Sequence, residues 1–347
     1  MSVLRVLSPG LHTTVQDLGR PGAQYLGVPV SGAIDAVNLR LANLLAGNGE
    51  AAGALEILMH GPSFEVAAES ARLAVAGPGA GIELLQSGQL AGAKSFESTT
   101  LTRGDQFRVT LGEASSICYL AVEGGFAIPP VMGSQSTFVR GGLGGFMGRP
   151  LKKEDEVPLN RTEASSRAEC AISGIAFPSQ TRFRIMLGPQ DDYFTPEAIE
   201  AFLAATFTVS HHADRMGFRL SGFALQHSGD FNIVSDGTAP GAIQVPGSGE
   251  PIVLLADRQT TGGYPKIGVV ISADLPALGR LRPGRQLSFR AVDYDEARNA
   301  AGELNAWFSK VKSSIREITA RPAVDIGALF EQNLIDGVVD AKVPLVD

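Results

Sequence analysis

Residues 256–268 read Ala-Asp-Arg-Gln-Thr-Thr-Gly-Gly-Tyr-Pro-Lys-Ile-Gly and join two apolar runs, residues 251–255 and 268–271. Both runs are typical of short buried strands. A plain hairpin would connect such strands with a few Gly, Asn or Asp residues. This connection instead carries a carboxylate, a guanidinium, an amide, hydroxyls, a phenol and an ammonium. So many donors and acceptors between two core strands indicate a pocket for a polar ligand.

The rest of the chain is punctuated by turns. Its 41 glycines and 20 prolines are spread along 347 residues and separate short apolar runs. Several runs are β-branched or alternate between apolar and polar side chains, which predicts strands bounded by turns. The strands are expected at residues 54–59, 71–76, 116–122, 182–187, 251–255, 269–271 and 287–292. The fold class is therefore predicted as mainly β.

Few helices are expected. One is predicted over residues 35–46, with Asp35 as its N-cap and Gly47 as its stop. A second covers residues 196–204, where a proline opens the first turn. The third covers residues 295–315, in which one apolar stripe recurs at helical spacing. The stripe consists of Ala297, Ala301, Leu304, Phe308, Val311 and Ile315.

The composition is that of a globular, soluble chain, with 44% apolar and 19% charged residues. The length allows two domains or one large one. A net charge of −7 without a basic cluster argues against non-specific nucleic-acid binding. Cys118 and Cys170 make neither a disulfide scaffold nor a zinc site, and they fit a reducing compartment. Residues 1–7 hold no long apolar core and no run approaches about 20 apolar residues, so a cytoplasmic protein is expected.

Several common functional motifs are absent. No Gly-Lys-Ser/Thr of a phosphate-binding loop occurs, and residues 77–82 and 142–147 lack the last glycine of a dinucleotide fingerprint. Adjacent strand residues such as His211 and His212 cannot both face one metal, so no metal ligand set is evident. No Gly-x-Ser-x-Gly nucleophile turn occurs either. The usual nucleotide, metal and serine-hydrolase classes therefore lose support.

Two polar segments of the first half are candidate sites. Residues 12–20 are rich in side-chain donors, among them His12 and Gln16; the structural alternative is a loop in which Asp17 and Arg20 satisfy backbone groups. Residues 133–145 combine polar side chains with glycines that let the backbone approach an anion. The alternative for this segment is a flexible surface loop.

Two further polar segments lie in the second half. At residues 214–220, Arg215 offers a guanidinium for a carboxylate or phosphate, or else forms a structural ion pair at a strand entrance. In the opening stretch, Lys266 is the natural electrostatic stabiliser and Asp257 the natural general base. The predicted catalytic residues are Asp257, Lys266 and Tyr264, and the predicted substrate- or phosphate-binding residues are Arg215, Asp214, Gln244, Arg258, Gln259, Thr261, Ser134, Ser136, Arg140, His12 and Gln16.

These segments, taken in order, resemble the allophanate-hydrolase-subunit-2 family of biotin-dependent carboxyltransferase-like proteins. The resemblance covers roughly residues 3–292. It is carried by Gly10–Arg20, Ser31–Asp35, Leu39–Asn43, Gly133–Thr137, Gly188–Gln190, Asp214–Gly217, Gly241–Pro246, Asp257–Gly268 and Leu281–Gly284. Bacterial stand-alone members of the family are the C-subunit of ATP-dependent 5-oxoprolinase, and the same module occurs in urea carboxylase.

The resemblance implies two cyclophilin-like β-barrel domains with a few short helices and a C-terminal helical tail. We expect the first domain at residues 1–160, a polar linker at 161–180, the second domain at 181–293 and a helical extension at 294–347. Residues 101–109 and 281–289 are alike, with residues 151–157 as a weaker third case, which fits either two similar domains or recurrent turn chemistry. The extension either clasps a partner or a second copy, or packs on its own body.

The function implied by the resemblance is that of a component of a lactam hydrolase, which opens 5-oxo-L-proline to L-glutamate with ATP cleavage. It implies a complex with two companions, the B-subunit, which is similar to allophanate hydrolase subunit 1, and the A-subunit. ATP is expected at the level of the complex, since this chain has neither an ATP-binding module nor a Met-Lys-Met biotin attachment site. One alternative is a carboxyltransferase or allophanate-hydrolase-related component of urea or amide carboxylation. An alternative of another class is a regulatory protein that antagonises a kinase inhibitor.

Overall fold

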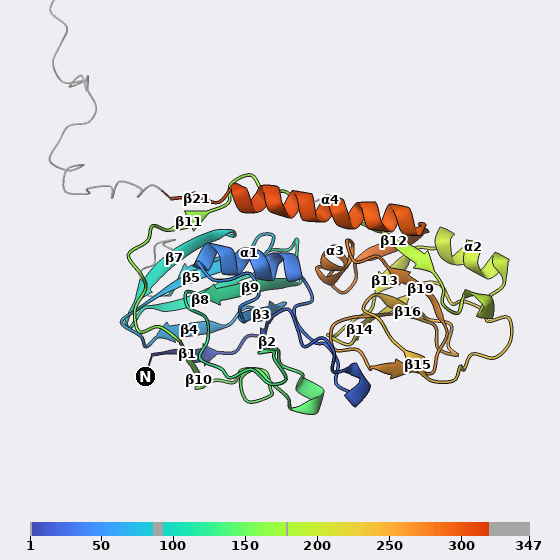
Figure 1. Ribbon diagram of the computed structural model, residues 1–347, viewed down its shortest axis with the longest axis horizontal. Helices are drawn as coiled ribbons and strands as arrows, with labels where there is room; N and C mark the ends of the chain where they lie inside the picture. The colour runs from blue at the N-terminus through green and yellow to red at the C-terminus, as the bar shows by residue number, and fades with distance from the viewer. Residues whose placement is uncertain (1, 86–92, 178–179, 319–347) are drawn as a thin grey trace, which may run out of the picture.

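The computed structural model describes residues 2–85, 93–177 and 180–318, which form two β-rich lobes side by side (Figure 1). The first lobe contains two packed sheets. One has the strand order β10-β1-β4-β8-β6 and the other the order β2-β3-β9-β5-β7-β11-β21. Their strands are β1 Val3–Ser8, β2 His12–Gln16, β3 Ala54–Leu58, β4 Ser63–Val66, β5 Ser70–Ala76, β6 Gly81–Leu84, β7 Glu97–Thr102, β8 Gln106–Thr110, β9 Ile117–Val122, β10 Glu156–Pro158, β11 Cys170–Ala171 and β21 Arg316–Glu317.

The second lobe is a closed barrel with the strand order β12-β19-β16-β17-β14-β13-β20. Its strands are β12 Arg182–Leu187, β13 Phe207–Val209, β14 Gly217–Ser221, β16 Ala242–Gln244, β17 Ile252–Leu254, β19 Lys266–Val270 and β20 Gln286–Ala291. A separate pair, β15 Asp236–Gly237 and β18 Thr261–Gly262, lies at one end of the barrel. The described chain is thus mainly β, with a closed barrel and a long C-terminal helix, as the sequence predicted.

Each lobe has its own apolar core. In the first lobe, side chains from both sheets meet between them, and Leu4, Leu55, Phe64 and Phe107 have no exposed surface. The barrel is filled mainly by aromatic and β-branched side chains, and helix α2 (Pro196–Ala204) covers it through the fully buried Phe202. Alternating inward residues on short strands explain both cores.

Helix α1 (Ala36–Ala46) starts and ends where its sequence predicts. The carboxylate of Asp35 accepts hydrogen bonds from the backbone N–H groups of Val37 and Asn38, which satisfies two of the helix's free donors. Gly47 then adopts φ 84°, a left-handed conformation that favours glycine. The short helix α3 (Leu275–Gly279) and the 3-10 turns η1 (Gln24–Leu26), η2 (Val139–Gly141) and η3 (Asp191–Tyr193) complete the elements of the described residues.

Helix α4 (Tyr294–Ser313) runs along both lobes and covers α1 (Figure 1). Phe308 and Val311, on the predicted apolar stripe, lie in a third core with α1 and the outer face of the second sheet. The Arg40 guanidinium stands 3.7 Å over the Phe308 ring. This part of the C-terminal extension therefore packs on the protein's own body. The remainder of the predicted extension, residues 319–347, lies outside the described residues.

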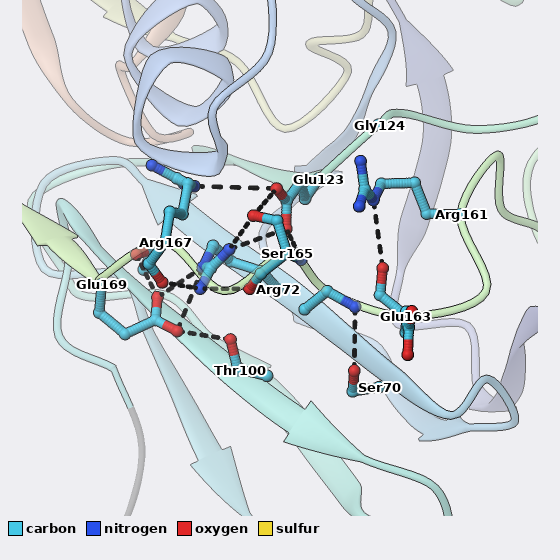
Figure 2. Close-up of polar contacts among 12 residues, drawn as sticks. Ser70, Arg72, Thr100, Glu123, Gly124, Arg161, Glu163, Ser165, Arg167 and Glu169 are labelled. Atoms are coloured by element: carbon cyan, nitrogen blue, oxygen red, sulfur yellow. Dashed lines mark hydrogen bonds and ion pairs between the residues drawn. The ribbon is translucent and has the colours of Figure 1, made fainter.

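The segment predicted as a linker, residues 161–180, is held on the first lobe over most of its length. Figure 2 shows Arg72 of β5 at its centre, with the guanidinium 3.1 Å from the Ser165 hydroxyl and 2.8 Å from Glu123. Glu169 accepts from the same guanidinium at 3.2 Å and leads into β11, which pairs with β7. Because Arg72 is buried, these bonds satisfy a charge that would otherwise be costly.

The three similar sequences near residues 104, 154 and 284 all form turns that lead into strands. Gly104 precedes β8, Gly284 precedes β20, and Glu154 precedes β10. Their φ angles are 89°, 84° and 72°, so the left-handed turn position is the shared feature.

Phe308→Ala tests whether α4 is an integral part of the fold. Removing this buried ring from the third core is expected to lower the free energy of unfolding by about 3–5 kcal/mol. The measurement is urea denaturation of the full chain, with Asn299→Ala, at an exposed position of the same helix, as the matched control. A loss below about 1 kcal/mol would mean that α4 packs only loosely.

Candidate functional site

A buried group of charges joins the two lobes. Arg215, just before β14, donates from Nε and Nη2 to the two carboxylate oxygens of Asp257 at 2.8 and 3.1 Å. Its Nη1 donates to Glu56 on β3 of the first lobe, and its Nη2 also donates to the Gly32 carbonyl oxygen at 2.7 Å. We call Arg215, Asp257 and Glu56 the interlobe cluster. Four of the five guanidinium N–H donors are thereby engaged by the chain itself.

Glu56 is completely buried and its second oxygen is also satisfied. It accepts from the backbone N–H of Ile34 at 2.9 Å and from the hydroxyl of Tyr119 at 2.7 Å. Burial and the neighbouring carboxylates raise the pKa of Tyr119, so this phenol stays a donor. Burial works to lower the pKa of Arg215, but the carboxylates of Glu56 and Asp257 outweigh it and the pKa is raised. Arg215 therefore carries its full positive charge in the interlobe cluster.

A second ion pair reinforces the same junction. Arg280, after α3, donates to the carboxylate of Asp35 at 2.7 Å, so the residue that caps α1 also binds the second lobe. Asp35 and Glu56 are both wholly buried. Two buried ion pairs thus fix how the lobes sit against each other.

The segment of residues 12–20 contains a second cluster, centred on Asp17. Its carboxylate accepts from the backbone N–H groups of Gly19 and Gln135 and from the hydroxyls of Ser134 and Ser136. The nearby Arg20 donates to the Ser136 carbonyl. The structural alternative considered for Asp17 and Arg20 is thus what the structure shows: both satisfy loop groups.

The glycine-rich loop packs against this Asp17 cluster. A Cβ on Gly144 would lie 2.3 Å from the Ser136 carbonyl oxygen, and one on Gly145 would lie 1.8 Å from the Thr137 hydroxyl. Both glycines also adopt left-handed φ angles. The close backbone approach that these glycines permit is therefore made by the chain's own residues.

The remaining predicted binding residues of this region include Gln16, Arg140 and Asp214, and none of their side-chain bonds within the described residues reaches the interlobe cluster. Gln16 donates to Thr14 and to the Thr137 carbonyl, while its Oε1 has no hydrogen-bond partner in the described residues. Arg140 lies 3.8 Å from Asp214, and both side chains are exposed. The Asp214 carboxylate also accepts from the backbone N–H of Met216 and so caps the turn into β14.

The pKa of His12, on β2, is affected by the charges of the interlobe cluster. Burial is the main cause that lowers its pKa, and the positive charge of Arg215 lowers it further, against weaker opposing effects of Glu56 and Asp257. Its Nδ1 is buried and has no hydrogen-bond partner in the described part of the chain. His12 is therefore neutral at pH 7.

A third cluster surrounds Lys266, the first residue of β19. Its ammonium is almost fully buried yet lies 2.9 Å from the half-exposed carboxylate of Asp236 on β15. Gln190 fixes the arrangement, since its Nε2 donates to Asp236 at 3.2 Å and its Oε1 accepts from the Lys266 backbone N–H. The hydrogen bond from Lys266 is the main cause that lowers the pKa of Asp236.

Polar groups of the opening stretch extend this Lys266 cluster. Gln259 donates to the Oε1 of Gln244, which is the strand partner of Lys266. The Nε2 of Gln244 is buried and has no partner among the residues described. Thr261 lies on β18, and Tyr264 exposes 40% of its surface beside it. The stretch thus contains the short strand β18 and the first residues of β19, where the sequence predicted an unpaired connection.

Arg258 stands apart from all three clusters. Its side chain is 3% exposed and makes only long hydrogen bonds, from Nε to the Thr238 carbonyl at 3.3 Å and from Nη1 to the Leu255 carbonyl at 3.4 Å. No carboxylate lies within 4.0 Å of it in the described chain, and burial lowers its pKa. It remains a cation all the same, because an arginine is not deprotonated at physiological pH.

The structure therefore divides the predicted site residues among three clusters and one isolated arginine. Asp257 and Arg215 are brought together, but no direct side-chain bond joins Asp257 to Lys266 within the described ranges. Sequence reasoning missed Glu56, Asp236 and Gln190. Glu56 had a detectable signal, since a glutamate inside the apolar run of residues 54–59 must find a buried partner. Gln190 lies in Gly188–Gln190, one of the segments that carry the family resemblance, but it was given no role. Asp236 had no signal, because its position depends on pairing between distant strands.

Two absences concern the described residues only. They contain no group of three or more His, Cys, Asp or Glu side chains arranged to hold a metal ion. Nor does any helix among them combine the length and apolarity needed to cross a membrane.

With the two antiparallel sheets, the closed barrel and the polar clusters described, the chain can be compared with known families. A family model described as the carboxyltransferase domain, subdomain A and B, matches residues 26–291. The match spans more than half of the sequence, and the chain belongs to this carboxyltransferase domain family.

Individual relatives show which members of this family the chain is similar to. The chain is 34% identical over 309 residues to the 5-oxoprolinase C-subunit of Escherichia coli strain K12, and the alignment covers 89% of this chain and 97% of that protein. It is 30% identical over 315 residues to the 5-oxoprolinase C-subunit of Haemophilus influenzae, covering 91% and 99%. The crystal structure of the Kluyveromyces lactis urea carboxylase superposes with a TM-score of 0.80 at 29% identity, covering 91% of this chain but 30% of that one.

Arg215→Met tests the weight of the interlobe cluster. The variant leaves Glu56 and Asp257 buried without a cation and is expected to lower the free energy of unfolding by about 3–5 kcal/mol. Adding Glu56→Gln should recover part of the loss, because one uncompensated charge disappears. Urea denaturation measures both, with the exposed Arg219→Met as control. If Arg215→Met unfolds as the wild type does, the cluster is not what joins the lobes.

The lowered pKa of His12 has a consequence for stability at acidic pH. Below the ordinary histidine pKa of about 6.5 the unfolded chain binds a proton that the folded chain refuses, so stability falls as pH falls. Between pH 7 and pH 5 the wild type should therefore lose more stability than His12→Gln. Denaturation curves across this range check the difference, and an NMR titration of the His12 ring at or above about 6.5 would contradict it.

Proposed function

We propose that this chain is the C-subunit of an ATP-dependent 5-oxoprolinase complex, in which 5-oxo-L-proline is hydrolysed to L-glutamate. The observation that carries the proposal is the end-to-end match with the Escherichia coli C-subunit, which covers 97% of that protein. By contrast, the alignment with the Saccharomyces cerevisiae urea amidolyase covers 17% of the longer chain. The alignment over nearly the whole bacterial protein therefore favours the 5-oxoprolinase C-subunit as the model for this chain's function.

The Lys266 cluster supports a role in lactam chemistry. Hydrolysis of a lactam develops negative charge on its oxygen, and a buried ammonium stabilises such charge strongly because water is largely excluded. Lys266 has this burial, whereas its counter-ion Asp236 is half-exposed on a two-stranded element. An anionic substrate group can therefore take the place of Asp236 without leaving a buried carboxylate unpaired.

The remaining predicted residues are assigned supporting roles. Gln244, with a free buried Nε2, and Gln259 can donate to the same substrate from one side of the ammonium. Tyr264, two residues before Lys266 in the sequence, offers a partly exposed phenol. Asp257 serves as a general base only if its bond to Arg215 is released, so in the proposed mechanism it chiefly positions the interlobe cluster.

ATP supplies the phosphoryl group that turns a poorly electrophilic lactam into a reactive one. The chain lacks a phosphate-binding loop motif, and its one buried ammonium among the described residues is paired with a single carboxylate. These residues fit one anionic group better than a triphosphate. We therefore propose that ATP is bound with the help of the companion A- and B-subunits, and the names of the bacterial relatives, as one of several components, support such a complex.

A second function has its own support. The family model is described as a carboxyltransferase domain, and the superposition on the urea carboxylase has a TM-score of 0.80. On this alternative the same clusters would hold a carboxylated carrier and a urea-like acceptor, and the carrier would come from another chain.

Lys266→Met tests the proposed mechanism. The methionine fills the volume of the buried stem, and the exposed Asp236 tolerates the loss of its partner, so the fold should remain. Together with its companion proteins, the variant is expected to lose about 100-fold or more of its 5-oxoproline-dependent ATP hydrolysis. Phosphate release is the measurement.

Lys153→Met, at an exposed turn position, is the matched control and should keep full activity. Unchanged turnover in Lys266→Met would remove the Lys266 cluster from the mechanism. A wild-type complex that transfers a carboxyl group to urea from a biotinylated carrier, and leaves 5-oxoproline untouched, would instead establish the second function.

A further inference from the structure

A cavity of about 330 Å³ lies between the lobes, and Arg258 forms part of its lining. One wall comes from the segment before α1 and includes Val30, Ser31 and Ile34; the other comes from the second lobe and includes Pro240, Leu255 and Leu275. This volume is at the lower end of the range for small-molecule sites. Most of the wall is apolar, with Arg258 as the cation among its lining residues.

The arginine is the unusual feature of this wall. A buried charge is normally paired, as the Arg215, Arg280 and Arg72 guanidinium groups are in the same molecule. Arg258 is as deeply buried as these residues yet has only two weak carbonyl acceptors. In the described residues no carboxylate forms an ion pair with it, so its charge is available to a ligand anion.

A second unsatisfied group lies on the opposite wall. The hydroxyl of Ser31 is buried and has no hydrogen-bond partner in the described residues. Ser31 adopts φ 55°, a conformation that is uncommon for a residue with a side chain. The segment is held there by the interlobe cluster, since Gly32 accepts from Arg215 and Ile34 donates to Glu56. The wall is therefore built in advance of any ligand.

We propose that this interlobe cavity binds a small monocarboxylate whose body is apolar, with the carboxylate on Arg258 and a hydrogen bond from Ser31. A guanidinium matches a carboxylate through two parallel N–H donors. A phosphate dianion carries two charges, whereas Arg258 is the single cation among the lining residues, and the mainly apolar walls favour a compact hydrocarbon or ring. This inference rests on the proposed function for the natural ligand, 5-oxoproline, whose carboxylate Arg258 binds. No residue of the Lys266 cluster lines the cavity, so the cavity is a binding site separate from the proposed chemistry at Lys266.

The test is calorimetric titration of the purified full chain with four probes. 5-Oxo-L-proline and cyclopentanecarboxylate carry the carboxylate on a small ring, 2-pyrrolidinone lacks it, and inorganic phosphate replaces it. Both carboxylates are expected to bind, and 2-pyrrolidinone at least about 10-fold more weakly, since it lacks the charge-assisted bond. Equal affinity for 2-pyrrolidinone, tighter binding of phosphate or no binding of either carboxylate overturns the proposal.

Arg258→Met supplies the second measurement. It should weaken binding of both carboxylates about 10- to 100-fold, while Arg219→Met, on the exposed face of β14, leaves it unchanged. Without ligand, Arg258→Met should raise the melting temperature, because an unpaired buried charge is removed. A lowered melting temperature with unchanged binding would show a structural arginine. The probes on the wild type decide the proposal even if the variant does not fold.

Failure of this inference is distinguishable from failure of the proposed function. A complex that hydrolyses 5-oxoproline although the chain alone binds neither carboxylate leaves the function intact and removes the cavity from it. A chain that binds cyclopentanecarboxylate through Arg258, in a complex without 5-oxoprolinase activity, keeps the carboxylate site and rejects the function.

Discussion

The ion pair of Arg215 with Glu56 and Asp257 is the contact on which the arrangement of the lobes depends. Its three members come from β3, from the start of β14 and from the stretch after β17, so it forms only when both lobes are folded and docked. Buried charges of this kind add little net stability but penalise every arrangement that separates them. The cluster also bonds to Gly32 and Ile34, which belong to the segment that forms one wall of the interlobe cavity. The bond from Arg215 to Gly32 therefore joins the lobes, and together with the bond from Ile34 to Glu56 it holds one wall of the interlobe cavity.

The described cations show how charge balance separates structure from chemistry. Arg72, Arg215 and Arg280 each meet carboxylates that are largely buried, which marks them as parts of the fold. Lys266 meets a half-exposed carboxylate that a ligand can displace. Arg258 forms no ion pair in the described chain, and neither does the loop residue Arg20, which donates to the Ser136 carbonyl. A cation that has no carboxylate partner, or a partner that can be displaced, can still form an ion pair with a ligand. Lys266 and Arg258 therefore remain the strongest candidates of the original stretch.

Local sequence predicted those features that depend on local geometry. Asp35 and Gly47 delimited α1, the period of residues 295–315 predicted α4, and each predicted apolar run falls on a strand, although many of the shorter strands were not predicted. The site was harder, because side chains meet through pairing between distant strands. Arg215 was recognised as an anion-binding group, yet nothing near it in sequence indicates Glu56, 159 positions away, as its partner. The glycines near residue 144 were read as a ligand cradle, although residues 136 and 137 occupy the space beside them.

Helix α4 has a consequence for how the molecule is made. It is the last long element of the described chain, and its Phe308 and Val311 complete a core whose other members lie mainly before residue 122. During synthesis on the ribosome, the outer face of the second sheet and α1 are finished long before these side chains exist. That apolar face must wait uncovered while the whole barrel is translated and folds. Most strands of the first lobe are thus translated first, but its outer core is completed only when α4 packs on it.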